Sequence, residues 1–293
     1  MYWERMREEE FAAAIETFGG LCALPLSGME KHGQHLPVGT DGMIADAIID
    51  RALQMEDTVI FPTGSWLGDV SAHYETMANG KARWRGSIEL SKNLQLTLLE
   101  EICDEIRRCG FRKVLIIYKS PSCTGLAGLF TRHIEYERRD YATMIVSAVN
   151  EEKSTPEYVL KTVTERKEAF PMITGEDIRT LKRWAENGQK SITYIDTALM
   201  LASYRHLVAK ERMHAEQNIS SYDTNAFDDG VVFTGMGRKQ FPNGIYAQVA
   251  EGCTESIGEA ILKINAEHLA SVFKLLKEDE ECIRIANGIP MDV

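Results

Sequence analysis

The sequence predicts a three-layer α/β/α protein built on a mostly parallel β-sheet. Unbroken apolar runs are typical of strands that are buried on both faces. Four such runs occur along the chain, at 21–26, 58–63, 113–118 and 142–149. Longer segments with apolar residues at helical spacing separate them, at 42–55, 90–109 and 124–138. Strands that alternate with helices favour parallel pairing, with helices covering both faces of the sheet.

The second half of the chain adds mostly helical patterns. Residues 150–190 are more charged than their surroundings and are predicted to be a helical insertion on the surface. Helices are predicted at 193–206 and, as a long closing element, at 254–279. Because no internal repeat or low-complexity segment divides the sequence, residues 1–293 are predicted to form a single domain.

Composition and charge exclude several classes of function. The chain has 293 residues, 44% of them apolar, and a net charge of −11. Binding to nucleic acid or to an anionic membrane needs clustered Lys and Arg, so neither partner is expected. No apolar run approaches the roughly 20 residues that span a bilayer. The start reads as an amphipathic helix, and the six cysteines form no C-x-x-C pair, which indicates a cytoplasmic protein with reduced thiols.

The stretch GMEKHGQHLPVGTD (28–41) carries the strongest chemical signal. It follows the first predicted strand, and ligands of α/β sheets bind beyond the carboxyl ends of the strands. In extended backbone Glu30 and His32 point to one side, and Asp41 opens the next helix. Carboxylate, imidazole and carboxylate form a ligand set suited to Zn, Mn or Fe. The simpler alternative is that Asp41 or Thr40 only caps the helix.

This stretch resembles a known signature. The longer run LPLSGMEKHGQHLPVGTD is very similar to P-x-G-S-x-E-Q-H-G-x-H-L-P-x-x-T-D, the signature of the creatininase (creatinine amidohydrolase) family. Two weaker similarities follow, at 71–91, which carries His73, and in the segment NGIYAQVAEGCTESIGEAIL near the end. The resemblance covers most of the chain and implies a creatininase-like fold.

The resemblance also implies a metal site and an assembly. In that family the Glu, the first His and the Asp of the signature bind metal, and the Asp bridges two ions. These positions fall on Glu30, His32 and Asp41, whereas His35 falls on a second His that we interpret as structural or as supporting the ligands. Family members form symmetric ring-like oligomers, so a homo-oligomer larger than a dimer is expected, with a hexamer favoured.

Two later signatures of the family are altered. The family has N-G-H-G-G-N after a strand, and its His binds metal, but this chain reads YKSPSCTG and places Ser120 at the His. The family's H-A-G-x-x-E-T-S is best matched by SITYIDTALML, which places Ser191 at the His and Asp196 at the Glu. An imidazole is lost at each place, and one carboxylate is retained in a shorter side chain.

These changes predict about one divalent metal ion per chain. The ion that would use Glu30, Asp41 and the missing His is predicted to be weakened or absent. The ion held by His32, Asp41 and Asp196 is predicted to be retained, with Asp196 in the first turn of its helix, where the N-terminus favours an ionised carboxylate.

The predicted function is a metal-dependent hydrolase that opens a small polar cyclic substrate. Glu30 is the candidate general base if it is freed from ligation, and Lys119 or Tyr194 would stabilise the oxyanion or protonate the leaving group. His73 would contact the substrate, although a structural hydrogen bond is an equal alternative. Taken individually, Lys119 and Tyr194 are more often surface or packing residues.

Two questions about the reaction stay open at the level of sequence. Family members mostly cleave C–N bonds of cyclic or formyl amides, and some relatives open an oxidised inositol at a C–C bond (3-dehydro-scyllo-inosose hydrolase). The altered signatures argue against creatinine itself and leave both a cyclic amide and a cyclic diketone open. The alternative of another class is a non-catalytic homologue with a degraded metal site that binds a ligand or a partner.

Overall fold

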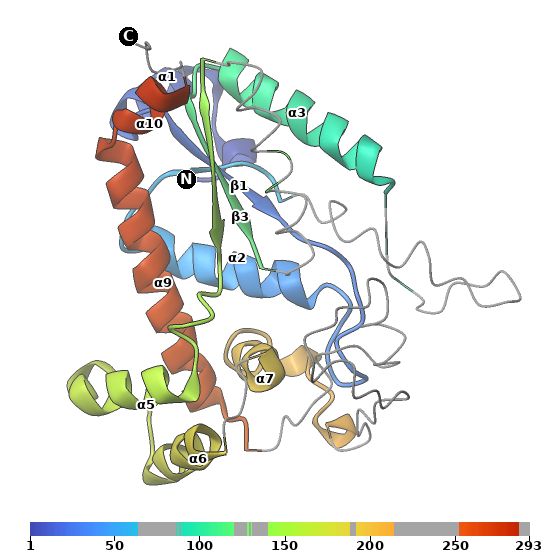
Figure 1. Ribbon diagram of the computed structural model, residues 1–293, viewed down its shortest axis with the longest axis vertical. Helices are drawn as coiled ribbons and strands as arrows, with labels where there is room; N and C mark the ends of the chain where they lie inside the picture. The colour runs from blue at the N-terminus through green and yellow to red at the C-terminus, as the bar shows by residue number, and fades with distance from the viewer. Residues whose placement is uncertain are drawn as a thin grey trace, which may run out of the picture.

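A parallel sheet lies at the centre of the molecule (Figure 1). The computed structural model describes residues 1–63, 86, 88, 90–119, 128, 130, 140–187, 192–213 and 252–286. Its four described strands are β1 (Leu21–Leu26), β2 (Val59–Ile60), β3 (Lys113–Tyr118) and β4 (Ala142–Ser147). They pair in parallel in the order β2-β1-β3-β4. The parallel sheet and all four strand positions predicted from the sequence are confirmed, although β2 is shorter than expected.

The described helices follow the predicted order. They are α1 (Glu8–Thr17), α2 (Thr40–Leu53), α3 (Lys92–Arg108), α5 (Pro156–Glu165), α6 (Gly175–Glu186), α7 (Ile192–Ser203), α9 (Glu255–Glu278) and α10 (Glu281–Ala286). The helix predicted at 124–138 lies outside the described residues except at positions 128 and 130, which are helical. None of the described helices is both long and apolar enough to cross a membrane.

Alternate residues of the strands face two separate cores. Leu21 and Ala23 of β1 pack into one core with apolar residues of α2, α7 and α9. Cys22 and Leu24 point the other way, into a second core with residues of α1 and α3. This is the period of two that a strand imposes on its side chains. Figure 1 shows α3 on one side of the sheet and α2 and α9 on the other, so the predicted three layers are confirmed.

The ends of β1 and β3 lie side by side. The two strands pair without a slip from Leu21 and Lys113 to Leu26 and Tyr118. Because both run in the same direction, the residues that follow them leave the sheet at the same edge. This places the predicted metal-binding stretch of 28–41 beside Lys119.

Helix α7 is held against α9 by a close backbone contact. A side chain at Gly258 would meet the carbonyl oxygen of Ala198, because a Cβ built there lies 1.9 Å from it. Only glycine allows α9 to approach α7 at this distance. The contact fixes α7, and with it the carboxylate of Asp196, relative to the sheet.

The region 150–190 is helical and contributes to the core. It contains α5 and α6, whose residues Val159, Val163, Leu181 and Trp184 are buried in the same core as α9. Whether this region is an insertion within a single domain of 1–293 stays a prediction.

Candidate metal centre

The loop between β1 and α2 turns back on itself so that its polar side chains meet. The backbone N–H of Glu30 donates to the carbonyl of Val38 at 3.0 Å, which closes the loop. Gly33 has a φ of 70°, a left-handed conformation that favours glycine. The carbonyl of His35 accepts from the N–H of Ala209 at 2.9 Å, which ties the loop to the segment after α7. The loop is therefore pinned at both ends and in its middle.

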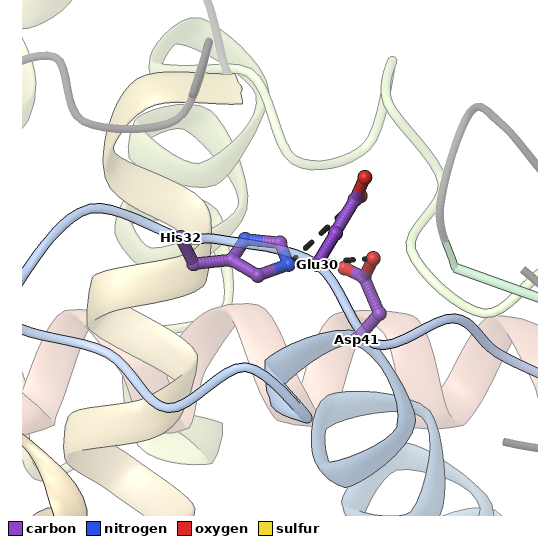
Figure 2. A group of neighbouring side chains, drawn as sticks. All are labelled: Glu30, His32 and Asp41. Atoms are coloured by element: carbon purple, nitrogen blue, oxygen red, sulfur yellow. Dashed lines mark ion pairs between the residues drawn. The ribbon is translucent and has the colours of Figure 1, made fainter. Parts of the chain in front are cut away.

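Glu30, His32 and Asp41 point toward one another (Figure 2). The Nε2 atom of His32 lies 3.4 Å from Oδ2 of Asp41 and 4.0 Å from Oε1 of Glu30. One potential ligand atom from each residue lies within 4.8 Å of the others. Bond lengths of 2.0–2.2 Å to zinc place tetrahedral ligand atoms about 3–3.5 Å apart, so small side-chain shifts would complete the site. The three side chains form a buried set of two oxygens and one nitrogen.

Asp41 is placed for this site and does not cap its helix. Helix α2 has Gly39 as its N-cap, with no side-chain capping bond, and the Asp41 side chain is fully buried. Both carboxylate oxygens of Asp41 face described partners, Oδ1 the ammonium group of Lys119 at 2.6 Å and Oδ2 the Nε2 atom of His32 at 3.4 Å. Burial raises the pKa of Asp41, but Lys119 and His32 outweigh it and hold the pKa well below its usual range. The capping alternative is therefore not supported.

Lys119 follows β3 and extends its ammonium group into the cluster. Its Nζ atom lies 2.6 Å from Oδ1 of Asp41 and 2.6 Å from Oδ1 of Asp196, and its side chain is 5% exposed. The two carboxylates come from α2 and α7, so one ammonium group joins three elements. At these distances the ammonium group forms ion pairs with both carboxylates.

Asp196 lies behind His32, on the other side of the ring from Glu30 and Asp41. Its Oδ2 atom is 3.2 Å from Nδ1 of His32, whereas Asp41 and Glu30 face the other ring nitrogen, Nε2. A carboxylate in this position typically orients a metal-binding histidine without touching the ion. The geometry thus differs from the predicted role of Asp196 as a direct ligand.

The helix position predicted for Asp196 is wrong. Helix α7 begins at Ile192 and has no acidic residue in its first turn, so the helix N-terminus contributes little to Asp196. Burial raises the pKa of Asp196, but the Lys119 ammonium and His32 outweigh it and lower the pKa. A side-chain cation therefore supplies the stabilisation that was expected from the helix.

The pKa values of the two buried loop histidines, His32 and His35, shift in opposite directions. Burial lowers the pKa of His32, but Asp41 and Asp196 outweigh it and raise the pKa to about 10. Burial lowers the pKa of His35, whose Nε2 atom lies 2.8 Å from the hydroxyl of Thr197. His35 thus holds α7 next to Asp196, in keeping with the structural role predicted for it. Its pairing with Thr197 carried no local sequence signal.

Tyr194 is not brought to the cluster. Its hydroxyl donates to the carbonyl of Ser154, and its ring lies 4.5 Å from that of Trp184. Residues two apart on a helix face different directions, so Tyr194 and Asp196 cannot both face the ligand group. Burial raises the pKa of the phenol, which disfavours acid–base work. His73 of the predicted site, like Ser120 and Ser191, lies outside the described residues.

One described cavity lies away from this cluster. It has a volume of about 700 Å³ and is lined by residues around the end of α7, among them Leu201, Arg205 and Glu255. No residue of the Glu30–His32–Asp41 group lines it. The candidate chemistry therefore does not rest on this cavity.

A parallel α/β/α sandwich with buried carboxylates and a histidine at its strand ends defines a candidate metalloprotein. The family model Creatininase, described as creatinine amidohydrolase, matches residues 4–273. The chain therefore belongs to the creatininase family, and the resemblance seen in its sequence is confirmed.

Solved creatininase structures share this fold. A crystal structure of creatinine amidohydrolase (creatininase) has a TM-score of 0.67 and 17% identity, covering 95% of this chain and 98% of that one. A structure described as creatininase Mn has a TM-score of 0.66 and 18% identity, over 95% and 99%. A mutant creatininase described as Zn–Zn type has a TM-score of 0.64 and 15% identity, over 95% and 98%. At these identities the likeness concerns the fold, and no curated protein matches the chain significantly.

Proposed function

We propose that this chain is a metal-dependent hydrolase that opens a small polar cyclic substrate at an amide C–N bond. The observation that carries the proposal is the buried group of Glu30, His32 and Asp41, in a chain of the creatininase family. Structural neighbours described as Mn and Zn–Zn types support a divalent metal as the cofactor. Zn, Mn and Fe all suit two carboxylates and an imidazole, so the donor set does not choose among them.

A divalent ion at this site would supply Lewis acidity, polarising a carbonyl oxygen and lowering the pKa of water. The protein's own contribution begins with Glu30. Among the three proposed ligands Glu30 has the only exposed surface, at 8%, and its Oε1 atom is the farthest from His32. A carboxylate that ligates through one oxygen keeps the second, so Glu30 can accept a proton from attacking water and return it to the leaving nitrogen.

Lys119 would act through its charge. The ammonium group is held by Asp41 and Asp196 at 2.6 Å each, and two anionic partners stabilise its charged form. A fixed positive charge beside the ligand group favours the negative charge that develops on a carbonyl oxygen during hydrolysis. Stabilisation of the oxyanion is therefore the proposed role for Lys119, in preference to proton donation.

The second candidate reaction is hydrolysis of a C–C bond in a cyclic diketone such as an oxidised inositol. The observation that favours it is again Lys119, because its ammonium group directly follows β3, one residue before Ser120, which stands at the position of the family's metal-binding histidine. A substrate with two adjacent carbonyl groups offers two oxygens, one for a metal ion and one for a cation.

Metal analysis and a substrate panel test the proposal together. Protein purified after growth with added Zn and Mn should carry about one ion per chain by plasma mass spectrometry. It should open at least one cyclic amide or cyclic diketone, and a chelator should abolish the activity until metal is restored. Metal-free protein after such growth would instead support the non-catalytic homologue that binds a ligand or partner.

We also propose a homo-oligomer larger than a dimer, with a hexamer favoured. The support is the family's ring-like assembly, and an acidic surface does not prevent a specific closed interface. Light scattering at micromolar concentration should give a mass well above 66 kDa, about twice the 33.0 kDa of one chain.

A further inference from the structure

The ammonium group of Lys119 occupies a position that suits a metal ion. It lies between Oδ1 of Asp41 and Oδ1 of Asp196, at 2.6 Å from each, and is almost fully buried. Carboxylate oxygens from two separate helices thus converge on one small cation. Lysine places a compact point charge at the end of a long, flexible side chain.

Asp41 divides its two oxygens between two cation positions. Its Oδ2 atom faces Nε2 of His32 at 3.4 Å, on the side of the possible ligand group with Glu30. Its Oδ1 atom faces the ammonium group of Lys119. A carboxylate used in this way bridges two positive charges, and here one of them belongs to the protein.

Charge balance in the buried cluster fits a single divalent ion. Glu30, Asp41 and Asp196 carry three negative charges and are at most 8% exposed. Lys119 offsets one of these charges, and one divalent ion on neutral His32 would offset the other two. Buried charge is costly unless it is compensated, so a second divalent ion beside Lys119 would leave a large positive excess.

A second buried lysine, at the opposite end of β3, shows a different arrangement. Lys113, at the start of β3, is 1% exposed, and its Nζ atom donates to the carbonyls of Leu276 and Lys277 at the end of α9. Its carboxylate partner, Glu280, has a largely exposed side chain. Lys113 therefore caps a helix, whereas Lys119 is enclosed by two buried carboxylates.

We propose that Lys119 is a built-in cation that takes the place of a second metal ion between Asp41 and Asp196, so that each chain holds one divalent ion. This inference rests on the proposed function, because it assumes that Glu30, His32 and Asp41 bind metal. It predicts that removal of the lysine charge opens the second position to a cation.

The test counts metal ions in the full-length protein, without an activity assay. Wild-type protein, Lys119→Arg, Lys119→Ala and Lys113→Met are each equilibrated with Mn²⁺, and the bound ions are counted by plasma mass spectrometry. Electron paramagnetic resonance then reports whether two Mn²⁺ ions are close enough to couple. Lys113→Met is the matched control, because it removes a buried lysine from the opposite end of β3, away from Asp41.

One ion per chain is expected in wild-type protein, Lys119→Arg and Lys113→Met. Lys119→Ala should bind two ions, with a coupled Mn²⁺ signal. Since Lys119→Ala leaves two carboxylates without their cation, it can fail to fold. The double variant Lys119→Ala/Asp196→Asn removes both members of one ion pair, and it should fold and bind a single ion.

Several outcomes would overturn the inference. Two ions per chain in wild-type protein would show that Lys119 does not replace one. A folded Lys119→Ala with a single ion, or a double variant as unstable as Lys119→Ala, would reduce Lys119 to a packing residue. No metal in wild-type protein would instead overturn the proposed function, so the two failures are distinguishable.

Discussion

The ends of β1 and β3 are neighbours in the sheet but have opposite chemistry. Leu26 and Tyr118 are paired at the last position of the two strands. The loop after β1 supplies anionic oxygens and an imidazole, and the residue directly after β3 supplies an ammonium group. Both sets of functional groups lie beyond the same edge of the sheet, at the carboxyl ends of its strands, as expected for an α/β fold.

The two strand ends differ in how closely they follow the family signature. The family signature is preserved after β1 and altered after β3, yet the altered side still delivers a cation to Asp41. The Lys119 ammonium thus compensates the buried charge of Asp41 although the signature residues after β3 differ. Substitutions after β1 and in α7 separate the contributions of these groups.

Asp41→Asn should have the largest effect, because Asp41 contacts both sides. Loss of a direct ligand should weaken metal affinity by more than about 100-fold, beyond the 10–100-fold typical of supporting residues. The metal-free protein should also lose about 3 kcal/mol of unfolding free energy, since Lys119 keeps only one carboxylate. Isothermal titration with Mn²⁺ and urea unfolding measure the two effects.

Asp46→Asn is the matched control for this change. Asp46 lies on the same helix, half-buried, and accepts a hydrogen bond from Thr63 at 3.0 Å outside the cluster. Its replacement should leave metal affinity unchanged. Equal losses in the two variants would mean that Asp41 acts through the stability of α2 and not as a ligand.

Asp196→Asn should have an intermediate effect. As the carboxylate that orients His32, it should weaken metal affinity by about 10–100-fold while one ion still binds at saturation. Thr197→Val removes the neighbouring contact to His35 and serves as the control, with affinity expected to change far less. If the variant binds no metal even at saturating concentration, Asp196 is a direct ligand, as the sequence predicted. If its metal affinity is unchanged, Asp196 has no role in metal binding.

Metal binding should depend on pH through His32. Its pKa is raised to about 10 in the metal-free protein, so the ring is protonated at pH 7–9. A metal ion needs a free nitrogen, and binding must therefore release about one proton. Affinity should rise roughly tenfold per pH unit below about pH 10 and level off above it.

Titration calorimetry at pH 8 in two buffers of different ionisation enthalpy measures the proton released. Asp196→Asn removes one of the two charges that raise the pKa of His32, so it should release a smaller fraction of a proton. Identical heats in both buffers for wild-type protein would mean that His32 is neutral before metal binds.

Tyr194→Phe should have the smallest effect. The change removes the hydrogen bond to the Ser154 carbonyl and should cost about 1 kcal/mol of stability. Metal affinity and kcat should not change, because the hydroxyl points away from the cluster. Tyr141→Phe, which removes a buried hydroxyl bonded to Asp104 in the other core, is the control. A large fall in kcat for Tyr194→Phe alone would reinstate the catalytic role predicted from the sequence.

The sequence by itself determined the fold class and the local part of the site. Unbroken apolar runs and helical spacing identify the sheet and its helices because burial imposes those periods on the chain. Glu30, His32 and Asp41 were predictable because they lie within one short stretch, where a glycine turn and a helix start bring them together. Local backbone geometry was sufficient for these three residues.

Only the tertiary structure decided how Lys119, Asp196 and Tyr194 are used. Lys119 reaches Asp41 because β3 pairs with β1 without a slip, and a shift of one residue would turn its side chain to the other face. Asp196 reaches His32 because Gly258 lets α9 hold α7 in place, which also directs Tyr194 away. Contacts between distant segments depend on register and on the approach of helices. Neither is encoded in the spacing of residues along one segment, so the sequence could name these three residues but not assign their partners.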